Sequence, residues 1–294
     1  MSKINFSETA VNINDVIDTN GTAIASYDDS LTENATERGL GFAHQPFIIS
    51  IDTSVSMESD AGNGMSKLEA CKALINNLPT SEGIRSLSAT DKDCVDMLVT
   101  SFHDKDVYIN SNWRPLSMFE GINNMDSGST TPLYKAIAES IQATRVMRHS
   151  YAQSGIECKR PQIFVYTDGL ATDDENRAEA KKLCQEYASK TANKVKLFVV
   201  LVPGSMSESQ IQTVSNDLLD LCDNVTLIKI DDCTNGLPAT FSFLTSSVVV
   251  GASSSIGADM FVRYDRNNNG NMMFANASVQ DGKVSIGQQI AWAG

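Results

Sequence analysis

The sequence predicts an α/β fold, namely a doubly wound, mostly parallel sheet with helices on both faces and a small antiparallel β appendage. Two observations carry this prediction. Between Phe47 and Val250, apolar segments of strand length alternate with segments whose apolar residues recur at helical spacing. Beyond them, strand-like segments surround turn residues, among them Asp281-Gly282, a two-residue hairpin signal.

Residues 46–256 are expected to form one domain of alternating strands and helices. It begins with a buried strand that ends at Asp52. A strand over 94–102 then pairs with 106–110 as a hairpin, and a loop passes through Trp113 and Met118. Further strands are predicted at 162–167, 195–202 and 225–230, and helices at 66–78, 132–149, 174–190, 208–221 and 237–250.

The two ends differ in composition from this middle part. Residues 1–45 are polar, and residues 257–294 contain strand-like segments at 258–264, 272–280 and 283–292. We expect the C-terminal segment to form the β appendage and the N-terminal extension to pack on it.

Composition limits the possible partners and compartments. The formal net charge is −13 and no Lys or Arg stripe carries interleaved aromatics, which excludes nucleic acid as the expected partner. Six scattered cysteines without ligand spacing indicate reduced, mostly buried thiols. The first residues lack an apolar leader segment, and the longest apolar run, 197–202, is too short to span a bilayer. We therefore expect a cytoplasmic protein without a membrane span.

A short motif at the end of the first buried strand carries the functional interpretation. Asp52, Ser54 and Ser56 follow the apolar run and are spaced two residues apart. One tight loop holding these oxygens is an all-oxygen cup of low charge, which suits a hard divalent cation such as Mg²⁺.

Two later segments supply further oxygen ligands at element boundaries. Thr131 stands before Pro132-Leu133 at a helix start, and Asp168 follows a buried strand and precedes Gly169. Each motif alone is more often a turn or a helix cap than a metal site. Their occurrence together, in this order, favours the metal site.

Taken together, these segments resemble a von Willebrand factor A (VWA) domain with its metal-ion-dependent adhesion site. The resemblance covers residues 46–256 and implies that Asp52, Ser54, Ser56, Thr131 and Asp168 form the metal site. It also implies Mg²⁺ or Mn²⁺ rather than Ca²⁺, and a partner protein whose Glu or Asp completes the coordination. One departure is Val55, where the family often has glycine.

Within the family, the length, the final helix and the Thr-Thr-Pro-Leu segment resemble the cytosolic TerY group. That group is associated with bacterial tellurium-resistance and related stress or phage-defence operons. The resemblance implies an adaptor or scaffold role, with a kinase or phosphatase of the same operon as a partner.

Two other classes of function remain open. The chain could be a structural component of a larger assembly whose metal pins the loops, or a metal-dependent hydrolase. Aspartate-nucleophile phosphatases need a second acid two residues after the nucleophile, and this chain has Ser54 there. The segment ending in Ser66-Lys67 lacks the order of a phosphate loop, no G-x-S-x-G occurs, and His103 is interpreted as a polar strand-end residue.

The loops expected around the cup are acidic. A rim of this sign favours a basic partner surface, although it would also serve solubility alone. Its residues are Glu58, Asp60, Asn63, Asp126, Asp173, Asp174 and Glu175.

Overall fold

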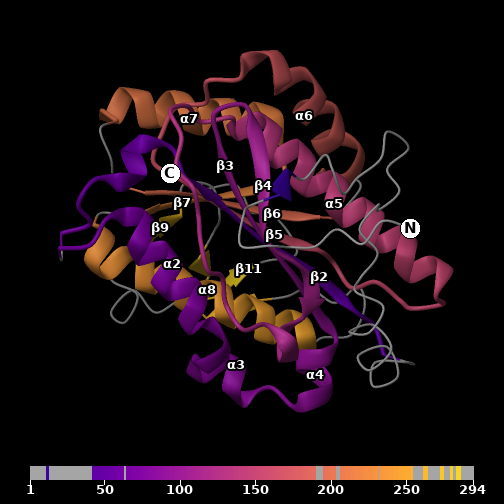
Figure 1. Ribbon diagram of the computed structural model, residues 1–294. Helices are drawn as coiled ribbons and strands as arrows, with labels where there is room; N and C mark the ends of the chain where they lie inside the picture. Colours follow the sequence, from indigo (N-terminus) through magenta and orange to yellow (C-terminus); the bar gives the residue numbers. More distant parts are fainter. Residues whose placement is uncertain are drawn as a thin grey trace.

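The structure is a computed structural model, shown in Figure 1. It describes residues 11–12, 42–62, 64–189, 195–202, 206–230 and 232–253, and the short segments 261–263, 272–274, 279–280 and 283–285.

A central sheet organises the domain. Its strand order is β1-β4-β3-β2-β5-β6-β7-β9, and β2, β3, β5, β6 and β7 run parallel. The six main strands are β2 (Gln45–Asp52), β3 (Val95–His103), β4 (Asp106–Pro115), β5 (Gln162–Thr167), β6 (Lys196–Leu201) and β7 (Val225–Ile230). Strand order reverses between β2 and β5, so that the chain segments that leave the carboxyl ends of these two strands diverge there. The predicted fold class is confirmed.

Helices cover both faces of this sheet (Figure 1). One face carries α2 (Lys67–Asn77), α3 (Glu82–Ser86), α4 (Ala89–Asp93) and α8 (Cys233–Ser253). The other carries α5 (Leu133–Gln153), α6 (Arg177–Leu183) and α7 (Glu208–Leu221). The intervening short turns are η2 (Val55–Glu58), η3 (Leu78–Thr80), η4 (Leu116–Met118), η5 (Asp174–Asn176) and the π-helical η6 (Cys184–Ala188).

Strand β2 shows why its sequence is almost continuously apolar. Phe47, Ile49 and Ile51 pack toward α2 and α8, whereas Ile48 packs toward α5. All four are 0% exposed, because side chains alternate across a sheet that is covered on both faces. Each such burial contributes about 1.5–3 kcal/mol, so the strand that leads to Asp52 is firmly held in the core.

Most predicted elements are observed, and the differences have local causes. Strand β4 continues to Pro115 and includes Trp113, so the predicted loop there is wrong; register shifts in its pairing with β3 interrupt the alternation that marks a strand. The segment 174–190 divides into η5, α6 and η6 as far as Ala188. The two short helices α3 and α4 were not predicted, because five residues show too little periodicity.

The described parts of the two chain ends form the outer strands of the central sheet and a separate three-stranded sheet. Strand β1 (Val11–Asn12) pairs with β4 and β9 (Met272–Phe274) with β7, at opposite edges. The predicted hairpin is observed as β10 (Val279–Gln280) with β11 (Lys283–Ser285), which also pairs with β8 (Phe261–Arg263). Val11 and Asn12 of the N-terminal extension pair with the open edge of β4, and the packing of this extension on the appendage stays a prediction.

The cysteines are free thiols, and all but the partly exposed Cys158 are buried, as the sequence predicts. None of the helices in the described ranges combines the length and the apolarity that crossing a membrane requires.

Helix α8 packs tightly on the end of β7, which gives a test of the fold. A Cβ added at Gly236 would lie 2.6 Å from Cβ of Ile230, a strand side chain that has no room to retreat. We expect Gly236→Ala to lower the free energy of unfolding by about 1–3 kcal/mol in urea denaturation. Gly83→Ala, whose Cβ would meet nothing nearer than 3.5 Å, is the control and should not destabilise the protein. Equal stability of the two variants would contradict this packing.

Candidate metal centre

Three loops meet at the carboxyl ends of β2 and β5. The loop after β2 contacts the loop before α5 through a bridge between Ser54 and Gly128, with Gly128 N donating to Thr53 O at 3.0 Å. The loop after β5 joins them where Thr172 N donates to Thr131 O and Thr131 N donates to Thr172 Oγ1, both at 3.0 Å. All five predicted site residues are thereby brought to one end of the sheet.

Asp52 is fixed beneath these loops and is 0% exposed. Its Oδ1 accepts from Ser54 N at 2.8 Å, and its Oδ2 accepts from the hydroxyl of Thr167 at 2.7 Å. Burial raises the pKa of Asp52 to about 6, although these hydrogen bonds act in the opposite direction. The carboxyl therefore has a fixed orientation and costs free energy when it ionises.

Hydroxyl groups connect the loop after β2 to Asp168. Ser54 Oγ and Ser56 Oγ lie 3.0 Å apart, and Ser56 Oγ donates to Asp168 Oδ1 at 2.6 Å. Ser54 occupies the N-cap position of η2, yet its side chain makes no capping bond. The alternative interpretation of this motif as a helix cap therefore fails, because the hydroxyls point into the site instead.

Thr131 likewise does not cap the helix that it precedes. The N-terminus of α5 is capped from another loop by Asp173, whose carboxylate accepts from Tyr134 N at 3.2 Å and from Lys135 N at 2.8 Å. Thr131 Oγ1 lies against the backbone beside Asp168, since a Cβ added at Gly169 would be 3.0 Å from it. Glycine at 169 thus lets this hydroxyl approach the acidic loop.

A lysine that the sequence analysis assigned to no site completes the group. Lys67 Nζ donates to Asp168 Oδ2 at 2.6 Å, and the two residues are 5% and 0% exposed. Asp168 is thus held on one oxygen by a hydroxyl and on the other by an ammonium group. No local signal identifies Lys67, because it lies eleven positions beyond Ser56 and pairs across 101 residues.

His103, together with Thr53, Tyr108 and Asp104, which the sequence analysis missed, holds the loops in place. Thr53 Oγ1 lies 2.8 Å from His103 Nδ1, and the His103 ring stacks on Tyr108 at 4.4 Å between centroids. Asp104, with a φ of 53° in the left-handed region, accepts from Ser129 N at 2.7 Å. His103 therefore supports the site from beside it, as expected of a strand-end residue.

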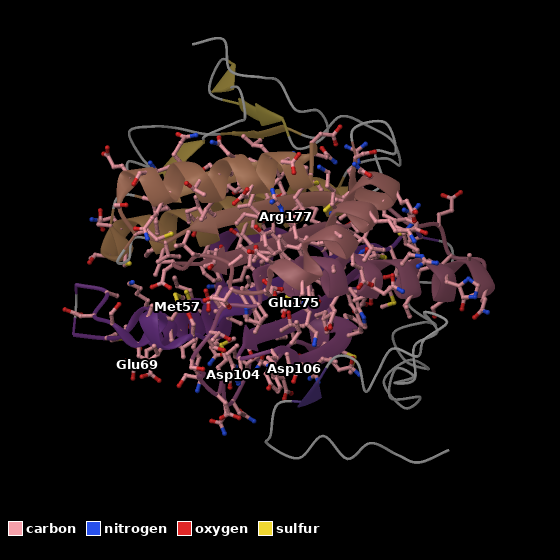
Figure 2. All side chains as sticks on the ribbon, turned by 90° about the horizontal axis from the view of Figure 1, so that it is seen from above. Met57, Glu69, Asp104, Asp106, Glu175 and Arg177 are labelled. Atoms are coloured by element: carbon pink, nitrogen blue, oxygen red, sulfur yellow. The ribbon has the colours of Figure 1, made fainter. Side chains whose placement is uncertain are left out.

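The predicted acidic rim is divided by the structure. Asp173 is only 4% exposed and caps α5, so it does not belong to the rim. Glu58, Asp60 and Asp174 are exposed, as is Glu175, which Figure 2 labels together with Asp104. Asn63 lies outside the described residues.

The donor set fits a hard cation in kind, because three hydroxyls and two carboxylates lie on loops that contact one another and the hydroxyls of Ser54 and Thr131 do not cap a helix. Within the described ranges no three His, Cys, Asp or Glu side chains are grouped to hold a metal ion. A site of this composition contains only two such side chains, so its ligands would have to be hydroxyl oxygens for the most part.

No protein-family model matches the sequence, and no curated protein gives a significant match. Solved structures do resemble the fold. The pilus adhesin SpaC from Lactobacillus rhamnosus GG is 10% identical with a TM-score of 0.51, over 85% of this chain and 38% of the adhesin. The PilB minor pilin from Streptococcus sanguinis is 11% identical with a TM-score of 0.48, over 71% of this chain and 62% of the pilin.

The ArnB paralog VWA2 from Sulfolobus acidocaldarius is 16% identical with a TM-score of 0.42, over 71% of this chain and 45% of that protein. The chain thus spans less than two thirds of each of these three proteins. At these identities the likeness concerns the fold alone.

The raised pKa of Asp52 makes stability depend on pH in a defined direction. The folded protein holds this proton more tightly than the unfolded chain, so the contribution to stability is present below about pH 4 and is lost as pH rises to about 6. Asparagine mimics the protonated form, since it offers one oxygen to Ser54 N and an amide to Thr167 Oγ1. In chelator, we expect Asp52→Asn to gain about 2–3 kcal/mol relative to the native chain between pH 4 and 6.5.

Urea denaturation across this pH range measures the difference. Asp174→Asn, which replaces an exposed acid of the loop after β5, is the control and should follow the native profile. Parallel profiles for the native chain and Asp52→Asn would show that Asp52 ionises as it does in the unfolded chain.

Proposed function

We propose that the chain is a non-catalytic protein-interaction module that binds a divalent cation and uses it to dock a carboxylate of a partner protein. Asp52, Ser54, Ser56, Thr131 and Asp168 would hold the ion. The observation that carries this proposal is the use of the hydroxyls. Ser54 and Ser56 lie in contact, Ser56 donates to Asp168, and the side chain of Ser54 makes no capping bond.

The chemistry of the donors favours Mg²⁺ or Mn²⁺ over Ca²⁺. Hard cations take oxygen ligands, and Mg²⁺ is commonly bound by one or two carboxylates together with waters, whereas Ca²⁺ takes six to eight oxygens. A cation held largely by neutral hydroxyls supplies a position that an incoming Glu or Asp can fill. The chain itself orients the hydroxyls, buries the two acids and keeps the loops together.

The residues around the site support a binding role rather than hydrolysis. A general acid or base must reach the reacting atoms, and the nearest histidine, His103, is 6% exposed and engaged with Thr53. Burial lowers the pKa of His103, against the effect of Asp104 and neighbouring acids. Position 54, where a phosphatase of the aspartate-nucleophile class needs its acid, carries a hydroxyl.

The cellular setting rests on the sequence resemblance to the TerY group. We propose on that basis a cytoplasmic adaptor of a bacterial or phage stress or defence system, related to tellurium resistance. A kinase or phosphatase encoded beside it would be the partner. The exposed acids Glu58, Asp60 and Glu175 favour a partner whose docking carboxylate is surrounded by basic residues.

Calorimetric titration of the chelator-treated protein with Mg²⁺ and with Mn²⁺ tests the metal site. We expect one ion per chain, at least about tenfold weaker binding in Ser54→Ala and in Thr131→Val, and none in the double variant Asp52→Ala with Ser54→Ala. Thr130→Val is the matched control, because the Thr130 hydroxyl bonds to Asp104 O outside the cup. Circular dichroism verifies the fold, and absence of binding by the native chain would overturn the metal site.

Affinity capture on the immobilised chain tests the docking role. We expect a partner from an extract of the producing cells to be retained with Mg²⁺, released by chelator, and not retained by Thr131→Val, because its carboxylate needs the ion. Retention under all three conditions would favour the structural-component alternative. Turnover of phosphate or peptide esters that is lost in Asp168→Ala would favour the hydrolase.

A further inference from the structure

We infer that Lys67 is a built-in cation of the metal centre: its ammonium group neutralises Asp168 when no metal is bound and competes with the divalent ion for that carboxylate. For the identity of the competing ion this inference rests on the proposed function. It assigns Lys67 a role in setting metal affinity, which distinguishes it from the five predicted ligands.

The geometry of the pair carries the first step. Asp168 is 0% exposed, so its charge requires a compensating partner in the folded chain. Lys67 Nζ supplies that partner at 2.6 Å from Oδ2, on the oxygen that Ser56 does not use. An ammonium group and a metal ion both compensate the negative charge of this carboxylate. When one of them is present, the carboxylate therefore gains less free energy from binding the other.

The chain makes a specific arrangement to place this charge. Lys67 is the first residue of α2, where the helix dipole disfavours a cation, and its side chain is 6% exposed. A lysine at the surface would form an ion pair that contributes little to stability, but it would not lose free energy through burial or through the helix dipole. The position of Lys67 is thus explained by Asp168 and not by the helix.

Backbone hydrogen bonds fix the chain just before α2. Lys67 N donates to Ser59 O at 3.0 Å and Ala61 N donates to Met65 O at 2.8 Å, which holds Ser59 and Ala61 against Lys67 and Met65. Ser66 then begins α2 with a capping box to Glu69. The backbone of Lys67 is therefore held by Ser59 and by the start of α2, and its side chain extends from this fixed position to Asp168.

Charge accounting gives the consequence. Asp52 and Asp168 together offer the site a charge of −2 when both are ionised, and Lys67 reduces it to −1. An ion of charge +2 that enters the cup is repelled by the ammonium group and must share Asp168 with it. The domain thus keeps its fold without metal and binds the ion less tightly than its two acids would allow.

The test compares metal binding in Lys67→Met, which keeps an unbranched side chain and removes the charge, with the native chain. We expect Mg²⁺ and Mn²⁺ to bind about tenfold more tightly or better in Lys67→Met by calorimetry. The rise in unfolding temperature on adding Mg²⁺ should also be larger than in the native chain. Lys72→Met removes a lysine from the same helix away from the pair, and it should bind the metal ions as the native chain does. Lys67→Arg keeps the positive charge, so its metal affinity should be closer to that of the native chain than the affinity of Lys67→Met is.

The variant remains informative when it is unstable. If Lys67→Met fails to fold in chelator, the inference requires that Mg²⁺ restores the native circular dichroism spectrum, because the ion replaces the lost cation. Failure of Mg²⁺ to restore the fold, or binding in a folded Lys67→Met that is equal to or weaker than native, would overturn the inference.

These outcomes separate the inference from the proposed function. Metal binding by the native chain without tighter binding in Lys67→Met would leave the function standing and remove the role of Lys67. Binding by Lys67→Met alone would show that Lys67 permanently replaces the metal, which would overturn the metal-dependent function. No binding by either folded protein would overturn both.

Discussion

The buried carboxylate of Asp168 is the constraint on which this end of the domain depends. It lies at the end of β5 with no exposure to solvent, so its charge has to be met by groups from other parts of the chain. Ser56 and Lys67 meet it on its two oxygens, and in doing so they bring the loop after β2 and the start of α2 to β5. The loop that holds Thr131 follows, because Gly169 leaves room for that hydroxyl.

The sheet makes this arrangement possible by placing two acids at neighbouring strand ends. Asp52 ends β2 and Asp168 follows β5, and these adjacent parallel strands lie where strand order reverses. Helices on both faces of the sheet bury the side chains of these strands. Thr167 links the two strands directly through its bond to Asp52. Two buried acids at neighbouring strand ends need a positive charge nearby, and the side chain of Lys67 provides it. The hydroxyls of Ser54 and Ser56 lie on the loop after β2.

Hydrogen bonds between loops hold the candidate site in place. Asp173 caps α5 from the loop after β5, and Asp104 holds the loop before Thr131, so that each ligand-bearing loop is tied to another loop. Far from the site, β1 and β9 cover the two open edges of the main strands. These terminal strands pair with part of each edge, two residues of β4 and three of β7.

The sequence by itself determined the fold class, the order of the main strands and helices, and five oxygen-bearing residues near the carboxyl ends of β2 and β5, because periodicity and short motifs are local properties. Tertiary structure alone decided what those residues contact. Lys67 reaches Asp168 across 101 residues and Thr167 reaches Asp52 across 115, and no local pattern records such pairs. It also decided that Asp173 caps α5 and that Val11–Asn12 joins β4, since a cap or a sheet edge accepts any segment with suitable backbone or carboxylate groups that the fold brings near.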